Sequence, residues 1–205
     1  MKITMLVEGK TEKAFIPVIR KYLEPRLAGK MPKIDVMPYD GLIPTEDRLR
    51  RVVLNLLYKK VKPSDCVIAL TDVYTGTLLP VFKDAQDAKN KMKLWVGDEP
   101  DFYPHVAQYD FEAWLLPYWG TIQKLAGHNK AAPSGKPETV NHNKPPSYHL
   151  KSIFETGNCR DSYVKTRDAR RILENNDLSV AIAQCSELKS LINTIITVSE
   201  GEPLE

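Results

Sequence analysis

Residues 66–72 read CVIALTD, a run of apolar residues and a threonine that ends in an aspartate. A short apolar run of this kind is typical of a strand buried on both faces of a sheet. The segment Lys2–Val7 (KITMLV) has the same character, and Glu8 and Gly9 follow it directly. The sequence therefore predicts two buried strands, each followed by a carboxylate.

The chain between these two strands alternates helix and strand patterns. Residues 11–27 place apolar side chains at helical spacing, with Thr11 as the expected N-cap, and 45–60 repeat the pattern behind Thr45. Residues 34–38 form a further strand candidate between the two helices. Strand–helix alternation is typical of a parallel sheet with crossover helices, so we predict an α/β fold.

The second half is less regular. We expect a helix over 81–92 and a fourth strand over 102–109, in which Pro104 favours a strand start or an edge position. The further helices expected are 111–116, 121–126, 148–154, 167–175 and 178–196, the last with a break near 184–186.

The predicted organisation is an α/β core over 1–127 and a C-terminal part over 128–205 that packs on it. The C-terminal part starts with a proline-rich segment, 131–146, which we interpret as a surface loop.

The bulk composition is that of a globular protein with 205 residues and a net charge of +3. This charge is compatible with nucleic-acid binding but does not demonstrate it. No apolar run is long enough for a membrane helix, and the start lacks the pattern of a signal peptide. The three cysteines, Cys66, Cys159 and Cys185, form neither a zinc motif nor a disulfide framework. We therefore expect a cytoplasmic location without membrane contact.

Glu8 and Asp72 are the best candidate site residues. Both follow predicted parallel strands, and ligands of open α/β sheets bind at the carboxyl ends of the strands. If the two strands are neighbours, the carboxylates repel one another unless a cation lies between them. Mg²⁺ fits because it prefers oxygen ligands and often takes only one or two carboxylates. The alternative is a solvated loop carboxylate at Glu8.

Other acidic residues are more ambiguous. Glu12 is a further metal-ligand candidate, or else a residue that stabilises the helix start. Asp110 and Glu112 follow the fourth strand, where either could be a cap or first-turn residue. Residues two apart do not share a helix face, so we expect at most one of them, preferably Glu112, to face the metal.

At these residues the sequence resembles a Toprim domain of the OLD-nuclease-like branch. VEGKTE, with Glu8 and Glu12, is similar to the glutamate motif that follows the first Toprim strand. TDVY supplies Asp72 of the Asp-x-Asp motif, but Tyr74 stands at the second aspartate position. The resemblance then implies that Asp84, Asp110 or Glu112 substitutes, or that the site holds one metal less firmly.

The resemblance extends over nearly the full length to a bacterial Toprim-like family of unknown function that is often paired with an ATPase. The similar stretches are VEGKTEKAF, TDVYTG, YPHVAQYDFEAWLL, PETVNHNKPPSYHL and a late YVK. It implies a Rossmann-like, mostly parallel sheet flanked by helices, with a C-terminal helical extension. By analogy it also implies an ATPase partner and a role in phage defence.

The function that follows is a Mg²⁺- or Mn²⁺-dependent nuclease that acts on DNA or RNA. Glu8, Asp72 and Lys165 are the candidate catalytic residues, and Glu8, Glu12, Asp72 and Glu112 the candidate metal ligands. The candidate nucleic-acid contacts are Lys10, Arg167, Arg170 and Arg171, with Lys144, His149 and Lys151 as additions from the edges of the proline-rich segment. The arginines alternatively form a solvated helix face.

Two other functions stay open. The chain could be a non-catalytic Toprim subunit that binds metal and nucleic acid and regulates a partner ATPase. Whether the chain forms a homo-oligomer stays open for each of these functions. A small-molecule phosphotransfer enzyme is the third possibility, against which the sequence has no GxxxxGK[ST] loop.

Overall fold

A computed structural model of the chain describes residues 1–73, 81–157 and 162–205. Its centre is a four-stranded, fully parallel sheet in the order β2-β1-β3-β4. The strands are β1 (Lys2–Val7), β2 (Lys33–Pro38), β3 (Cys66–Val73) and β4 (Phe102–Gln108). β1 and β3 are direct neighbours, which is the condition on which the predicted pairing of Glu8 with Asp72 depended.

Helices cover both faces of the sheet and extend beyond one end of it. Within the described residues they are α1 (Lys10–Leu23), α2 (Glu46–Tyr58), α3 (Ala85–Val96), the 3₁₀ helix η1 (Phe111–Tyr118), α4 (Trp119–Ala126), the 3₁₀ turn η2 (Pro137–Thr139), α5 (Pro146–Thr156), α6 (Lys165–Glu174), α7 (Leu178–Gln184) and α8 (Ser186–Val198).

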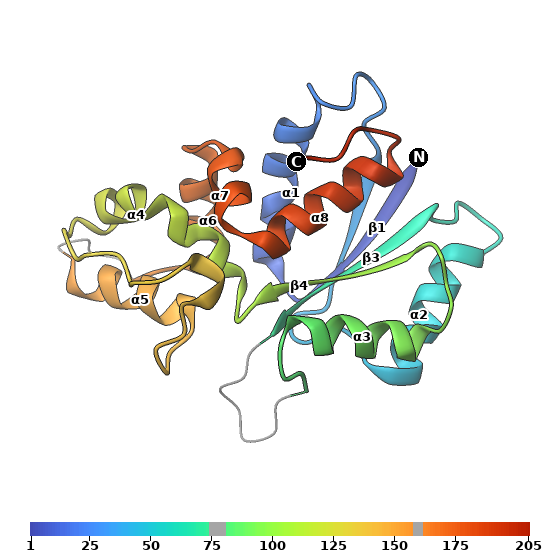
Figure 1. Cartoon of the computed structure of the whole chain (residues 1–205), viewed down its shortest axis with the longest axis horizontal. Helices are drawn as coiled ribbons and strands as arrows, with labels where there is room; N and C mark the ends of the chain where they lie inside the picture. Colours follow the sequence, from blue (N-terminus) through green and yellow to red (C-terminus); the bar gives the residue numbers. More distant parts are fainter. Residues whose placement is uncertain (74–80, 158–161) are drawn as a thin grey trace.

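Alternation along the strands separates two apolar layers. Met5 and Val7 of β1 face the core beneath α1 and α8, whereas Leu6 faces the smaller core beneath α2 and α3. Figure 1 shows this three-layer arrangement, with α4, α5 and α6 gathered beyond the end toward which the strands run. The helical group therefore packs against the carboxyl edge of the sheet, where the candidate residues lie.

Most predicted elements are confirmed, with local differences. The expected helix 81–92 is α3, shifted to Ala85–Val96, because Asp84 caps it by accepting a 2.8 Å hydrogen bond from the Asp87 N–H. Thr11 is not the cap of α1: Gly9 takes that position and Thr11 is buried inside the helix. The expected break in the last helix occurs at Cys185, between α7 and α8.

The C-terminal helices are continuous with the α/β core. The larger apolar cluster joins residues of β1 and α1 to residues of α5, α6, α7 and α8. The division at residue 127 therefore stays a prediction about organisation, since no gap in the packing marks it.

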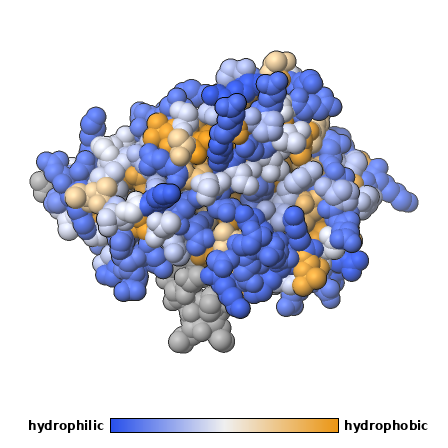
Figure 2. All heavy atoms as spheres, viewed as in Figure 1, coloured by the Kyte–Doolittle hydropathy of each residue, from blue (hydrophilic) through white to orange (hydrophobic). Residues whose placement is uncertain are grey.

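The surface is mainly polar on the face shown in Figure 2, where hydrophobic side chains occur in small groups. No helix in the described parts of the chain is long and apolar enough to span a bilayer.

Candidate functional site

The ends of three adjacent strands bring acidic side chains together. Glu8 follows β1, Asp72 is the penultimate residue of β3, and Asp110 lies two residues beyond β4. The sheet register aligns Val7 with Leu70 and Leu70 with His105, so the three chains leave the sheet at the same edge.

The main chain of β3 holds the Glu8 side chain in place. Glu8 Oε1 accepts a 3.0 Å hydrogen bond from the Asp72 N–H and a short one from the Thr71 hydroxyl. These two donors leave Glu8 beside the Asp72 carboxylate instead of pointing into solvent.

Glu12 belongs both to the start of α1 and to the acidic group, which consists of Glu8, Glu12, Asp72, Asp110 and Glu112. A Cβ on Gly9 would lie 3.4 Å from Glu12 Oε2, so the carboxylate folds back over the helix start. This is the third helical position, from which a glutamate satisfies the N–H of the capping residue. Glu12 is nevertheless buried, and its charge contributes to the raised pKa of Glu8. Glu12 therefore lies both at the helix start and beside the other carboxylates, and its role as a metal ligand stays a prediction.

The loop and helix after β4 contribute two carboxylates instead of one. Asp110 and Glu112 are both buried, and the negative charges of both raise the pKa of Asp72. The backbone turns at Tyr109, in the left-handed region at φ 69°, and then enters a 3₁₀ helix, so both carboxylates lie near Asp72. α-Helical spacing does not apply to such a turn. That at most one of them faces a metal stays a prediction.

Lys165 reaches the acidic group from the start of α6. Its Nζ lies 3.3 Å from Glu112 Oε2, and the Tyr163 hydroxyl donates a 3.3 Å hydrogen bond to Glu112 Oε1. Glu112 is fully buried, whereas the Lys165 side chain is 48% exposed. Lys165 is thus held at one end by Glu112 and remains accessible from solvent.

Asp110 has one oxygen engaged and one without a partner. Its Oδ2 accepts a 3.0 Å hydrogen bond from the Ser147 N–H at the start of α5. Its Oδ1 is buried and has no hydrogen-bond partner within the described residues. A buried, unsatisfied carboxylate oxygen is costly and calls for an explanation such as an ion.

Burial and the nearby negative charges raise the pKa values of several carboxylates in the acidic group. Burial, followed by the charges of Glu8, Asp110 and Glu12, holds the pKa of Asp72 well above its usual range. Burial and the charge of Glu112 raise the pKa of Asp110 to about 7, against the hydrogen bond from Ser147.

The other members follow the same pattern. Burial raises the pKa of Glu8 despite its hydrogen bonds from Thr71 and Asp72, and burial also raises the pKa of Glu12. Desolvation lowers the pKa of Lys165, but the charges of Glu112, Asp110 and Asp72 outweigh it and the net shift is upward. The group therefore favours any added positive charge.

The residues fit a divalent cation in chemistry, though not as a finished ligand cage. Oxygen donors, mutual repulsion and the unsatisfied Asp110 Oδ1 all suit Mg²⁺ or Mn²⁺. In the described parts of the chain, however, no three His, Cys, Asp or Glu side chains are grouped closely enough to hold an ion as they stand. Holding one would require small side-chain movements, with water or phosphate oxygens completing the shell.

The predicted basic residues are partly committed to other contacts. Arg167 and Arg171 both pair with the buried Asp168, at 2.8 Å and 3.6 Å, and Arg170 pairs with Glu174 at 2.7 Å. These ion pairs favour the helix-face interpretation of the arginine run.

The remaining candidate residues differ in their distance from the acidic group along the chain and, where the structure describes them, in their contacts. Lys10 is exposed as the first residue of α1, beside Glu8. Asp84 is exposed and caps α3. Tyr74 lies outside the described residues. Sequence reasoning missed Thr71, Ser147 and Tyr163, whose contacts with the carboxylates span long sequence separations that no local pattern signals.

Solved structures similar to this fold include C-terminal regions of OLD proteins from two bacteria. The C-terminal region of the Burkholderia pseudomallei OLD protein superposes with a TM-score of 0.53 at 14% identity, covering 96% of this chain and 98% of that one. The C-terminal region of the Xanthomonas campestris pv. campestris OLD protein gives 0.47 at 14% identity, covering 97% of each chain. The first likeness confirms the predicted fold, a Toprim-like parallel α/β sheet with a C-terminal helical extension.

No protein of curated function matches this sequence. A family model described as a domain of unknown function (DUF4276) matches residues 7–196, which includes every carboxylate of the acidic group. The chain therefore belongs to the DUF4276 family.

Proposed function

We propose that this chain is a Toprim-type nuclease subunit that uses Mg²⁺ or Mn²⁺ to cleave phosphodiester bonds in DNA or RNA. The observation that carries the proposal is the convergence of Glu8, Asp72 and Asp110 at the carboxyl ends of three adjacent parallel strands, with Glu12 and Glu112 against them. So many buried and half-buried carboxylates repel one another, and a divalent cation relieves that repulsion.

The roles follow from position and chemistry. Glu8, Glu12, Asp72 and Asp110 would hold the cation, which when bound stabilises the negative charge that develops on a phosphate under attack. Lys165 Nζ supplies a second positive charge to a phosphate oxygen. Glu112 and Tyr163 position that lysine through the contacts described above. Glu8, with its raised pKa, is also the group suited to exchange a proton with the attacking water or the leaving oxygen.

The partner of this chain and its biological role are proposed by analogy. The Burkholderia pseudomallei structure that shares this fold is the C-terminal region of an OLD protein, so we also propose that this chain works with a second component. The resemblance suggests an ATPase and a role in phage defence. ATP hydrolysis that copurifies with the chain from its native cells, and that a Glu8→Gln strain retains, would support this part of the proposal.

The nuclease is tested with the purified chain on plasmid, single-stranded DNA and tRNA, each with Mn²⁺, Mg²⁺ or EDTA. We expect cleavage with metal only, and a loss of at least about a hundredfold in Glu8→Gln and Asp72→Asn. Asp98→Asn is the matched control, because Asp98 is exposed and precedes β4 at the opposite edge of the sheet. Equal activity of Asp72→Asn and Asp98→Asn would refute the site assignment.

A non-catalytic subunit is the second candidate. It is favoured by the absence, within the described residues, of a preformed three-ligand group, and by the occupation of Glu112 by Lys165. Calorimetry with Mn²⁺ separates the two functions: metal binding that depends on Asp72, without cleavage of any of the three substrates, identifies the binding subunit.

A further inference from the structure

A pocket of about 390 Å³ opens directly beside the acidic group. Asp72, Asp110 and Lys165 are among the residues that line it. Tyr109, Tyr148 and Lys151 come from the turn after β4 and from α5. The volume lies near the lower end of the roughly 300–1,000 Å³ that is usual for small-ligand pockets, which suits a single nucleotide.

The tyrosines give the pocket an aromatic side. Tyr148 is 42% exposed and is fixed by its neighbours: Lys144 Nζ donates a 2.7 Å hydrogen bond to its hydroxyl and lies 3.9 Å from its ring centroid. The His149 ring meets it edge-on at 5.9 Å. An exposed aromatic ring that is held in one orientation is a ready stacking surface for a base.

The backbone at Tyr109 supports a built site. Tyr109 has φ 69°, a conformation that costs a tyrosine energy and that is commonest where function requires it. This turn places Tyr109 on the same pocket as Asp110, whose buried Oδ1 has no partner within the described residues.

The charges around the pocket suit a nucleotide chain. Lys151 of α5 lines it and Lys144 adjoins it through Tyr148, while Lys165 lies beside the carboxylates, so cations border the pocket at the acidic group and at α5. A phosphate placed at the acidic group would leave the adjoining base at the tyrosines and the next phosphate near these lysines. A base in a duplex cannot enter such a pocket without leaving its stack.

We propose that this pocket binds an unpaired nucleotide next to the phosphate held at the acidic group, and that the chain therefore acts on single-stranded or unpaired nucleic acid. The inference deepens the proposed nuclease function and, for its catalytic consequence, rests on it. DNA and RNA share the chemistry that the pocket recognises.

The test measures binding, so that it does not depend on cleavage. Fluorescence anisotropy compares a short labelled single-stranded DNA, the same sequence as RNA, and its blunt DNA duplex, in EDTA and again in Ca²⁺. We expect at least one single strand to bind more tightly than the duplex. Tyr148→Ala should weaken that binding by about tenfold, and Tyr148→Phe, which keeps the ring, by no more than about threefold.

Matched variants separate the pocket from the rest of the surface. Lys151→Ala should weaken single-strand binding and make it less dependent on salt. Tyr58→Ala, which removes an exposed tyrosine of α2, should leave it unchanged. Each variant must keep the wild-type melting temperature.

Two results overturn the inference: no preference for either single strand over the duplex in both buffers, or the same single-strand affinity in Tyr148→Ala and Tyr58→Ala. Failure of the nuclease gives a different pattern, in which Tyr148-dependent binding persists but no substrate is cut. Glu8→Gln should abolish cleavage while it keeps single-strand binding in EDTA.

Discussion

The Asp72 backbone N–H donates a 3.0 Å hydrogen bond to Glu8 Oε1. The main chain of β3 thus holds the carboxylate of Glu8, which follows the neighbouring strand β1. The donor residue, Asp72, itself carries the second carboxylate. Folding of the sheet therefore forces two negative charges together, and the cost is part of the fold itself. A bound cation would relieve this repulsion.

Asp72→Asn should therefore stabilise the protein without metal. The substitution removes a partly buried charge among like charges, and we expect a gain of about 1 kcal/mol in unfolding free energy, or about 2–4 °C in melting temperature. The measurement is thermal unfolding in EDTA.

Mn²⁺ should reverse the order of stability, so that the wild type becomes more stable than Asp72→Asn. A ligand that binds only the folded state raises its stability, so the wild type should gain in melting temperature with Mn²⁺ and Asp72→Asn should gain little. Asp98→Asn should behave as wild type in both conditions. A loss of stability in EDTA for Asp72→Asn would show that Asp72 has a structural partner instead.

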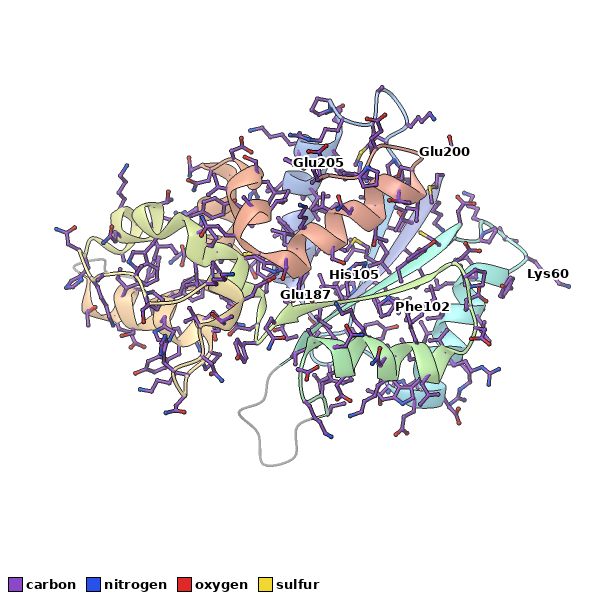
Figure 3. The ribbon with its side chains drawn as sticks, in the orientation of Figure 1. Lys60, Phe102, His105, Glu187, Glu200 and Glu205 are labelled. Atoms are coloured by element: carbon purple, nitrogen blue, oxygen red, sulfur yellow. The ribbon has the colours of Figure 1, made fainter. Side chains whose placement is uncertain are left out.

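His105 predicts a pH dependence of stability that is separate from the site. Figure 3 labels it on β4 beside α8; it is buried, and its Nε2 lies 2.9 Å from the Thr194 hydroxyl. Burial, followed by the charges of Lys89 and Lys93, lowers its pKa to about 3. The unfolded state takes up a proton near pH 6.5 and the folded state does not.

Stability should therefore be full above about pH 6.5 and fall as the pH decreases toward 3, by about 1.4 kcal/mol per unit. His105→Gln lacks this slope. Between pH 7.5 and pH 5 the wild type should therefore lose about 2 kcal/mol more unfolding free energy than the variant. Urea unfolding at both values measures it. The acidic group titrates in both proteins and cancels in the difference; parallel pH profiles would contradict the prediction.

How far the sequence could predict this molecule depends on the range of the interactions. β1, β3 and their carboxylates were predictable because strand patterns and the residues that follow them are local. The ordering of β1 beside β3 follows from common α/β topology. Lys165 was predicted as a catalytic residue but its partner was not, because its pairing with Glu112 spans 53 residues and depends on how α6 packs against η1.

The turn after β4 shows the same limit at short range. Asp110 and Glu112 were placed on α-helical spacing, whereas the chain adopts a positive φ at Tyr109 and then a 3₁₀ helix. No sequence rule assigns a positive φ to a tyrosine with confidence, since the conformation is imposed by packing around it. The pocket beside the site depends on that one turn.

Glu138 predicts a further stability effect, away from the site. Its carboxylate accepts hydrogen bonds from Trp114 Nε1 at 3.1 Å, from the Ser186 hydroxyl at 2.9 Å and from the Glu187 N–H at 3.1 Å. It therefore joins η1 to the start of α8 and acts as the helix cap that Cys185 does not supply. Glu138→Ala should cost about 2 kcal/mol.

Glu138→Gln should cost less, because its amide oxygen still accepts hydrogen bonds. Glu155→Ala, at an exposed position of α5, is the control and should change stability by less than about 0.5 kcal/mol. Chemical denaturation measures all three. A Glu138→Ala protein as stable as Glu155→Ala would mean that this carboxylate does not join the two helices.

Gly157 predicts a steric limit on the packing of α4 against α5. A Cβ at this position would lie 1.8 Å from the Ala126 carbonyl oxygen and 3.2 Å from that of Ile153. Backbone atoms cannot move aside as a flexible side chain can, so Gly157→Ala must separate the ends of the two helices. We expect a loss of at least about 2 kcal/mol.

Gly120 is the matched control, because a Cβ there meets nothing within 4 Å. It lies inside α4, where alanine is the better helix former, so Gly120→Ala should be neutral or stabilise by up to about 1 kcal/mol. Thermal unfolding of both variants tests the contrast. Since α5 also carries Tyr148 and Lys151, Gly157→Ala should in addition weaken single-strand binding, whereas equal stability of the two variants would refute the close approach of α4 to the end of α5.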